Sequence, residues 1–173
     1  LTVDREVVPD DKYNYRQALL DRFEDYGIRR APDADEDGTW KRFDGEKNKL
    51  VYSRTHYDSM LRDREEVFRF VWENRRQLEL TKDAYVEVQM VVPCIRIGPD
   101  GFVLRETVAE YIEILTLTAG ELGAIGIAPP PDLPKSQRTR LFGGGALIFD
   151  EYGQLKYQIA NHIANNDEDR RRQ

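Results

Sequence analysis

YVEVQMVVPCIRI at 85–97, GPDG at 98–101 and FVLRETVAEYIEILTLT at 102–118 form the stretch of sequence that decides the fold. Two long runs rich in β-branched and aromatic residues flank four turn-forming residues, which is the pattern of an antiparallel hairpin. We therefore expect two paired strands that meet at a turn over residues 98–101. The rest of the chain is expected to cover or extend this hairpin.

The first run predicts a strand that buries one face only. Side chains alternate between the two faces of a strand, and four apolar side chains share one face here: Val86, Val88, Met90 and Val92. After Pro93 the apolar positions change phase, because Ile95 and Ile97 fall on the opposite face. We therefore expect a bulge or bend at residues 91–94, which would return the apolar side to the core.

The second run allows two interpretations. From Glu106 onward, some apolar residues also follow the spacing of a helical stripe: Val108, Tyr111, Ile112 and Leu115. β-branched residues are frequent throughout the run, however, and they favour a strand. The strand interpretation places Met90 and Ile112 on neighbouring strands beneath a shared helical cover.

Elements are also predicted on both sides of this hairpin. Leu1–Val8 suits a short strand, and amphipathic spacing predicts helices over Lys12–Tyr26 and Tyr57–Leu78. A second hairpin is expected from residues 141–150 and 155–160. The predicted fold class is α+β, with an antiparallel sheet of about four to six strands built on hairpins and the two main helices covering one face.

The composition is that of a soluble, folded chain. Its 173 residues are 40% hydrophobic and 34% charged, with a net charge of −6. This predicts a single α+β domain over residues 1–173, with a polar tail at 161–173, and the domain could be excised from a longer chain. No apolar run is long enough to cross a bilayer, so we expect a cytoplasmic protein with no membrane partner. The negative net charge disfavours nucleic acid as a partner.

One acidic segment matches part of a calcium-binding loop. Carboxylates at alternate positions, followed by Gly38 at the sharp turn, allow several oxygens to converge on a hard cation. The candidate metal ligands are Asp33, Asp35, Asp37, Thr39 and Asp44. Position twelve of the loop is Asp44 instead of the usual Glu, and Lys41 stands at position nine. An acidic solvent-exposed loop explains the same residues. Calcium is the one cofactor that the sequence suggests.

The functional expectation is a non-catalytic protein-interaction or accessory module of a larger polypeptide or complex. No nucleophile–base pair, cofactor loop or zinc ligand set stands out in the sequence. The expected partner is a protein, and a free sheet edge at Pro93 could also recruit a second copy. Two alternatives stay open: a calcium-stabilised structural domain, and a metal-dependent hydrolase or nuclease that uses strand carboxylates such as Glu106 and Glu110.

Overall fold

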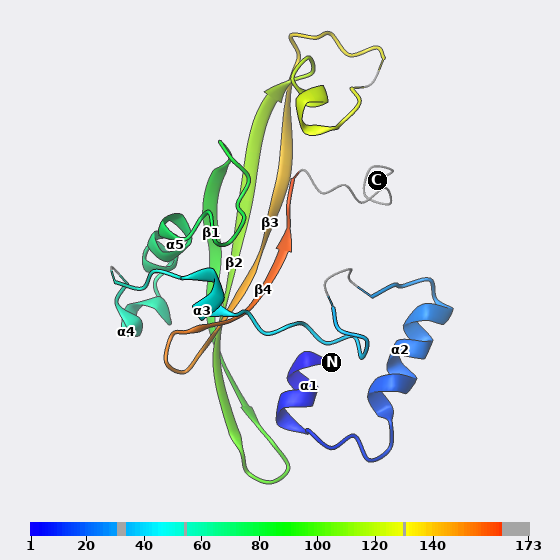
Figure 1. Cartoon of the computed structure of the whole chain (residues 1–173), viewed down its shortest axis with the longest axis vertical. Coiled ribbons are helices and arrows are strands. Elements are labelled where there is room, and N and C mark those ends of the chain that lie inside the picture. Colours follow the sequence, from blue (N-terminus) through cyan, green and yellow to red (C-terminus); the bar gives the residue numbers. More distant parts are fainter. Residues whose placement is uncertain (31–33, 54, 130, 164–173) are drawn as a thin grey trace.

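The computed structural model describes residues 1–30, 34–53, 55–129 and 131–163. Helices come first along the chain: α1 (Thr2–Val7), α2 (Tyr15–Asp25), α3 (Gly45–Asn48), α4 (Tyr57–Met60) and α5 (Arg64–Glu73). Strands follow, with a short 3₁₀ helix between the second and the third (Figure 1): β1 (Tyr85–Ile97), β2 (Val103–Thr118), η1 (Leu122–Ile125), β3 (Arg138–Asp150) and β4 (Leu155–Asn161). Within the described ranges, no helix has the length and apolar character needed to span a membrane.

The strands form an antiparallel sheet in the order β1-β2-β3-β4. Both predicted hairpins are confirmed, and the stretch after Glu106 is a strand, because β1 pairs with β2 from Tyr85↔Ile114 to Ile97↔Val103. The sheet has four strands in the described part of the chain, at the lower end of the expected range. The α+β class with an antiparallel sheet is therefore confirmed. The polar tail predicted at 161–173 falls mainly outside the described residues.

Helix α5 covers one face of the sheet, which we call the helix face. The α5 side chains of Val67, Phe70 and Val71 are fully buried. They belong to one core cluster with side chains from all four strands: Val86, Val88, Ala109, Tyr111, Leu147, Phe149 and Leu155. The rings of Phe70 and Phe149 meet edge to face with centroids 5.3 Å apart, a favoured aromatic geometry. The core thus lies between α5 and a single face of the sheet.

The helix predicted over Tyr57–Leu78 is divided into two. Helix α4 ends at Met60, the chain turns, and α5 begins after Asp63, whose carboxylate accepts a hydrogen bond from the backbone N–H of Glu65 at 2.9 Å. Such a side-chain cap favours a new helix start, and apolar spacing alone did not reveal it. Leu78 lies beyond the end of α5 but is still buried.

The N-terminal residues differ from the prediction. Leu1–Val8, expected as a strand, contains helix α1. Helix α2 confirms the predicted helix, but Leu20 is its buried residue, and Figure 1 shows α2 beside α1 and away from the sheet. A Cβ added to Gly38 would lie 2.6 Å from Leu20 and 2.9 Å from Leu1. Helix α5 thus supplies the cover of the sheet, and α2 packs onto the N-terminal segment.

The bulge in β1 lies earlier than predicted. The β1–β2 register shifts between Val88 and Met90, so Gln89 is the extra residue. After this shift Val91 packs against the core and Met90 faces the other way. The expectation that Met90 and Ile112 lie beneath the helical cover is therefore wrong. They share the opposite face of the sheet, which we call the outer face.

Two glycines of β3 let neighbouring strands approach closely. A Cβ on Gly144 would lie 2.2 Å from the backbone oxygen of Tyr111 on β2, and a Cβ on Gly145 would lie 2.3 Å from that of Ile159 on β4. Contacts this short exclude any side chain without a shift of the backbone. The glycine run at 143–145 therefore belongs to the interior of a strand and permits close packing of its neighbours.

Candidate functional site

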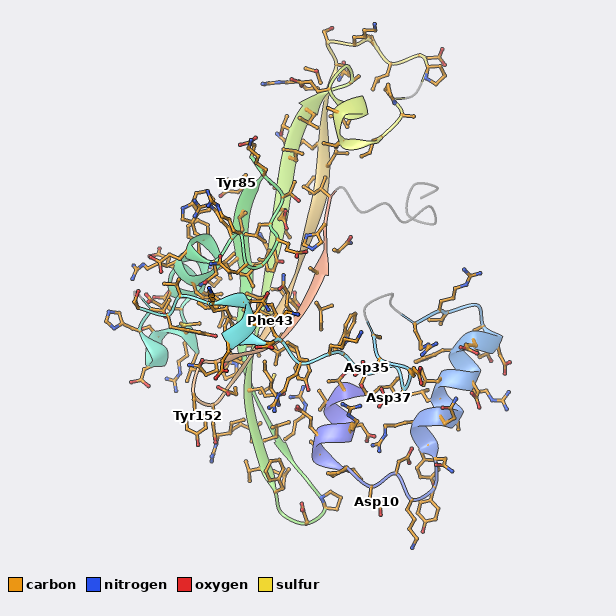
Figure 2. The ribbon with its side chains drawn as sticks, in the orientation of Figure 1. Asp10, Asp35, Asp37, Phe43, Tyr85 and Tyr152 are labelled. Atoms are coloured by element: carbon orange, nitrogen blue, oxygen red, sulfur yellow. The ribbon has the colours of Figure 1, made fainter. Side chains whose placement is uncertain are left out.

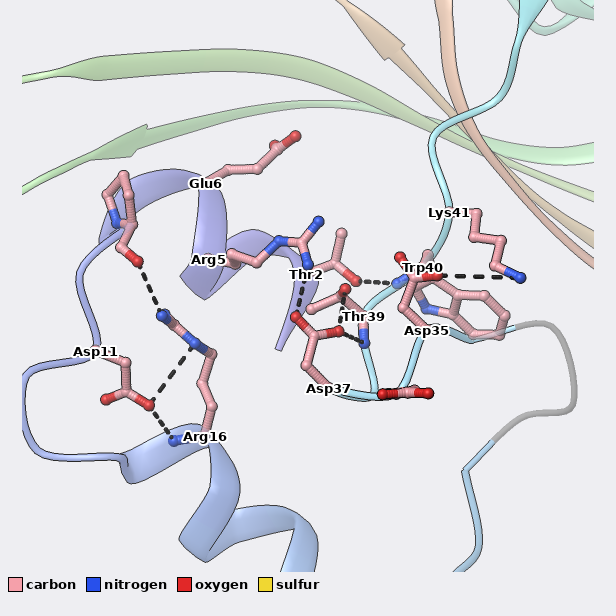
Figure 3. Close-up of polar contacts among 12 residues, drawn as sticks. Thr2, Arg5, Glu6, Asp11, Arg16, Asp35, Asp37, Thr39, Trp40 and Lys41 are labelled. Atoms are coloured by element: carbon pink, nitrogen blue, oxygen red, sulfur yellow. Dashed lines mark hydrogen bonds and ion pairs between the residues drawn. The ribbon is translucent and has the colours of Figure 1, made fainter.

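The acidic loop forms a compact set of contacts among its own residues and α1. One carboxylate oxygen of Asp37 accepts hydrogen bonds from the hydroxyl of Thr39 at 2.6 Å and from its backbone N–H at 3.1 Å (Figure 3). The other oxygen lies 2.6 Å from Nη1 of Arg5. The Thr39 hydrogen bond is the main cause that lowers the pKa of Asp37 from 3.8 to about 2, with Arg5 adding to it against some desolvation.

The remaining calcium-ligand candidates do not converge with Asp37. The backbone N–H of Asp35 donates to the carbonyl of Thr39, and its carboxylate lies 4.0 Å from Nζ of Lys41. Asp44 caps α3 by accepting from the backbone N–H of Lys47 at 2.9 Å. Asp33 lies outside the described residues. Among the residues that are described, no three His, Cys, Asp or Glu side chains are grouped so that they could hold a metal. Calcium binding by this loop stays a prediction.

The strand carboxylates predicted for a hydrolase are arranged differently from an open metal site. Glu106 and Glu110 do share the outer face, but the side chain of Glu106 is 2% exposed and lies 2.6 Å from Nζ of Lys156. Its second oxygen accepts from Nη1 of Arg96 at 3.0 Å. Glu110 is exposed to solvent. Two cations thus neutralise the buried carboxylate, which suits a structural role.

The same buried lysine connects α1 to the sheet. Nζ of Lys156 donates to the carboxylate of Glu6, and the hydroxyl of Tyr157 donates to the other oxygen of Glu6 at 2.7 Å. Partial burial raises the pKa of Glu6, but the hydrogen bonds from Lys156 and Tyr157 outweigh burial and lower it. Burial and the contact with Glu6 raise the pKa of Tyr157. This network, Glu6, Lys156, Glu106 and Arg96, contains two carboxylates and two cations.

Helix α5 presents aromatic side chains on the surface away from the core. The rings of Phe68 and Trp72 stack with centroids 6.2 Å apart, and the Arg75 guanidinium lies 5.0 Å from the Trp72 ring. Two surface depressions, of about 930 and about 700 Å³, share Trp72 and Arg75 in their walls. Their borders mix acidic and basic residues, so the charges do not define one kind of ligand.

Apolar side chains also lie on the outer face of the sheet. The strand register places ten apolar side chains on it besides the buried Tyr157: Tyr85, Met90, Val92, Val108, Ile112, Ile114, Phe142, Ala146, Ile148 and Ile159. Charged side chains, including Glu87, Glu106 and Glu110, lie among them. Tyr85 is 63% exposed and Phe142 is 65% exposed, and Ile114 lies between them in one cross-strand row. Figure 2 shows Tyr85 at the start of β1. Met90 and Val92 are also exposed, whereas the remaining six are half-buried.

The sequence predicted that the first strand buries one face only, and this second apolar surface was not predicted. A signal was present in β2, where Ile112 and Ile114 alternate with Tyr111 and Leu115, so that both faces of the strand carry apolar residues. Such a pattern is typical of a strand that is contacted on both faces. Comparisons of this chain with protein-family models, with curated proteins and with solved structures find no match.

Proposed function

We propose that this chain is a non-catalytic protein-interaction module that binds its partner through the outer face. One observation carries the proposal: an apolar surface crosses all four strands on the side of the sheet opposite α5. Four of its side chains are exposed and six are half-buried, and exposed apolar patches are characteristic of protein interaction sites. A cytoplasmic location fits such a module and stays a prediction.

The exposed side chains also suit a binding surface. Tyr85 and Phe142 stand on opposite sides of Ile114, and aromatic residues are among the side chains that contribute most to protein interfaces. Tyr85 projects from β1 and Phe142 from β3, and both strands are paired with β2 at the Ile114 row. A surface held in place by a sheet loses little conformational freedom on binding, which favours affinity.

The test replaces Tyr85 and Phe142 with serine in one variant. If the outer face is an exposed binding surface, retention of the dilute protein on a hydrophobic-interaction column is shortened. The free energy of unfolding in urea stays within about 0.5 kcal/mol of the original for each substitution, because neither side chain contributes to the core.

The matched control is Phe149→Ala on the helix face of the same sheet. Phe149 is 1% exposed, so its truncation is expected to cost about 3–5 kcal/mol of stability. The proposal is overturned if Tyr85→Ser/Phe142→Ser destabilises the protein as much as the Phe149 control does. In that case the outer face belongs to the folded interior and is not free to bind.

A further inference from the structure

The edges of the sheet are poorly suited to pairing with another chain. Strand β1 contains the bulge at Gln89, whose carbonyl accepts from Nη1 of Arg64 at 3.3 Å, and it also contains Pro93. A bulge, a basic side chain and a proline are all features that blunt an edge strand. At the opposite edge, the backbone N–H of Phe43 donates to the carbonyl of Lys156 on β4 at 2.8 Å. Both edges are therefore hindered. On the outer face, α1 contacts Tyr157 at the level of Ile148, and the rows from Glu110 to Thr116 lie beyond that contact.

The outer face carries exposed charges, among them Glu87 on β1 next to Ile112. Two others have opposite signs and lie at two levels. Arg140 lies on β3 next to Thr116, near one end of the apolar surface. Glu110 lies on β2 next to Ala146, toward the other end. Neither charge has an ion-pair partner among the residues that the structure describes. Each is therefore available to a chain that binds over this face.

The spacing of these charges is self-complementary. Arg140 is three residues before Gly143 on β3, and Ala146, the neighbour of Glu110, is three residues after it. Consider a two-fold axis that lies between the two sheets and runs across the strands at the level of Gly143. It brings Arg140 of each copy over the row of Ala146 and Glu110 in the other copy. In a two-fold interface each contact occurs twice, so this arrangement forms two equivalent ion pairs.

The same axis also places large side chains of one copy opposite small residues of the other. The axis at Gly143 brings Phe142, which stands out from β3, over Gly144 of the opposite copy. Gly144 has no side chain and Ala146 has a small one, so the strand presents a low stretch beside a tall residue. Packed sheets interlock through such alternation of large and small side chains.

The size of the surface suits a weak contact. From Thr116 to Val108 along β2 is roughly 26 Å, but β1 is paired only as far as Ile114 and β4 only as far as Gly144. The footprint is then on the order of 400 Å² per copy, or on the order of 800 Å² in total, which is the size of a weak interface that dissociates on dilution.

Building on the proposed function, we propose that the outer face binds the outer face of a second copy of this chain in a two-fold symmetric dimer. Arg140 pairs with the partner subunit's Glu110, and Phe142 packs over the low stretch at Gly144. The partner of the outer face is then a second copy of the chain, which associates through this face and not through the edge at Pro93.

The test is charge exchange measured by sedimentation equilibrium over a series of protein concentrations. The original chain is expected to show a dimer that dissociates on dilution. Arg140→Glu and Glu110→Arg each place two like-charge contacts in the interface, so each raises the dissociation constant about tenfold or more. In an equal mixture of the two variants, a dimer of one copy of each again has opposite charges at both contacts, so mixed dimers form. The double variant has opposite charges at both contacts within its own dimer and therefore dimerises like the original chain.

The control is Arg76→Glu, an exposed position that follows α5 and lies off the outer face, with the same change of charge. It leaves the dissociation constant unchanged. A chain that is monomeric at every concentration, or a dimer that tolerates Arg140→Glu and Glu110→Arg, overturns this inference. If the Tyr85→Ser/Phe142→Ser variant of that monomeric chain still shows shortened column retention at unchanged stability, the interaction module stands and its partner is a different protein. If that variant is destabilised like the Phe149 control, both proposals fail.

Discussion

Gly144 holds a backbone conformation that side chains rarely allow, with φ at +139°. Its missing Cβ also permits the close approach of Tyr111 on the neighbouring strand. The glycine run at 143–145 is visible in the sequence, but the sequence does not show which of its glycines is constrained by the backbone angle.

Gly144→Ala is expected to destabilise the fold by about 1–3 kcal/mol, because the new methyl group collides with backbone atoms and the φ angle is strained. Urea denaturation measures this loss. The control is Gly123→Ala in η1, where an added Cβ meets nothing within 4 Å and φ is not in the left-handed range. Equal stability of the Gly144 variant and the original chain would contradict the role assigned to this residue.

Asp37 links the acidic loop to α1, and its lowered pKa makes the free energy of unfolding depend on pH. Its pKa is lowered from 3.8 to about 2 in the folded chain. A carboxyl group with a lowered pKa stabilises the fold above its unfolded pKa, and this contribution is lost as the pH falls through the folded value. The contribution of Asp37 is therefore expected to disappear between about pH 4 and about pH 2.

Asp37→Asn should flatten the decline of the unfolding free energy over this pH interval. Its side chain is 44% exposed, so the change is small and is best measured at low salt, where screening is weakest. Asp10→Asn, at a position in the exposed loop before α2, is the control and should leave the slope as it was. An unchanged slope for Asp37→Asn would show that the contact with Thr39 and Arg5 does not persist in solution.

At the scale of elements, α1 shows how distant contacts override local preference. Valine and threonine near the N-terminus favoured a strand, but the helix places Glu6 against Lys156 and Tyr157, about 150 residues away in the chain. No residue of α1 is buried. Charged contacts therefore carry much of the attachment of this helix, and no sequence pattern within residues 1–8 predicts them. For β1 and β2, by contrast, the long runs of β-branched residues are themselves enough to predict strands.

Lys156→Met is expected to cost about 3–5 kcal/mol, because it leaves the carboxylates of Glu6 and Glu106 without their shared cation. Hydrogen exchange should at the same time increase at the amides of α1, since its main attachment is lost. Lys82→Met, an exposed position before β1, serves as the control with the same loss of charge. Unchanged protection of α1 in the Lys156 variant would show that other contacts hold the helix.

At the scale of the molecule, the core occupies one side of the sheet and apolar residues continue on the other. If two copies pair through their outer faces, dimerisation stabilises the folded chain by mass action. The thermal midpoint is then expected to rise with protein concentration in the original chain and to lose this dependence in Arg140→Glu. Scanning calorimetry at several concentrations measures both. A midpoint independent of concentration in the original chain would contradict a folded dimer.

The sequence predicted the hairpins, the α+β class and the helix-covered core, because strand composition and turn residues are local. It did not predict the apolar outer face. Alternate residues of β1 point to opposite faces of the sheet, and the position of the register shift decides which of them face α5. A register shift at Gln89 decides this, and the apolar pattern of residues 85–97 is compatible with a shift a few residues later.

The extra residue at Gln89 also constrains how this chain can change in length. Removing one residue from β1 between Val88 and Val91 would carry Val91 out of the interior and bring its neighbours inward. Evolution can therefore lengthen or shorten the connection at residues 119–137 far more freely than this short interval. Among diverged descendants of the chain, the spacing from Val88 to Val91 should stay constant even where the residues themselves have been replaced.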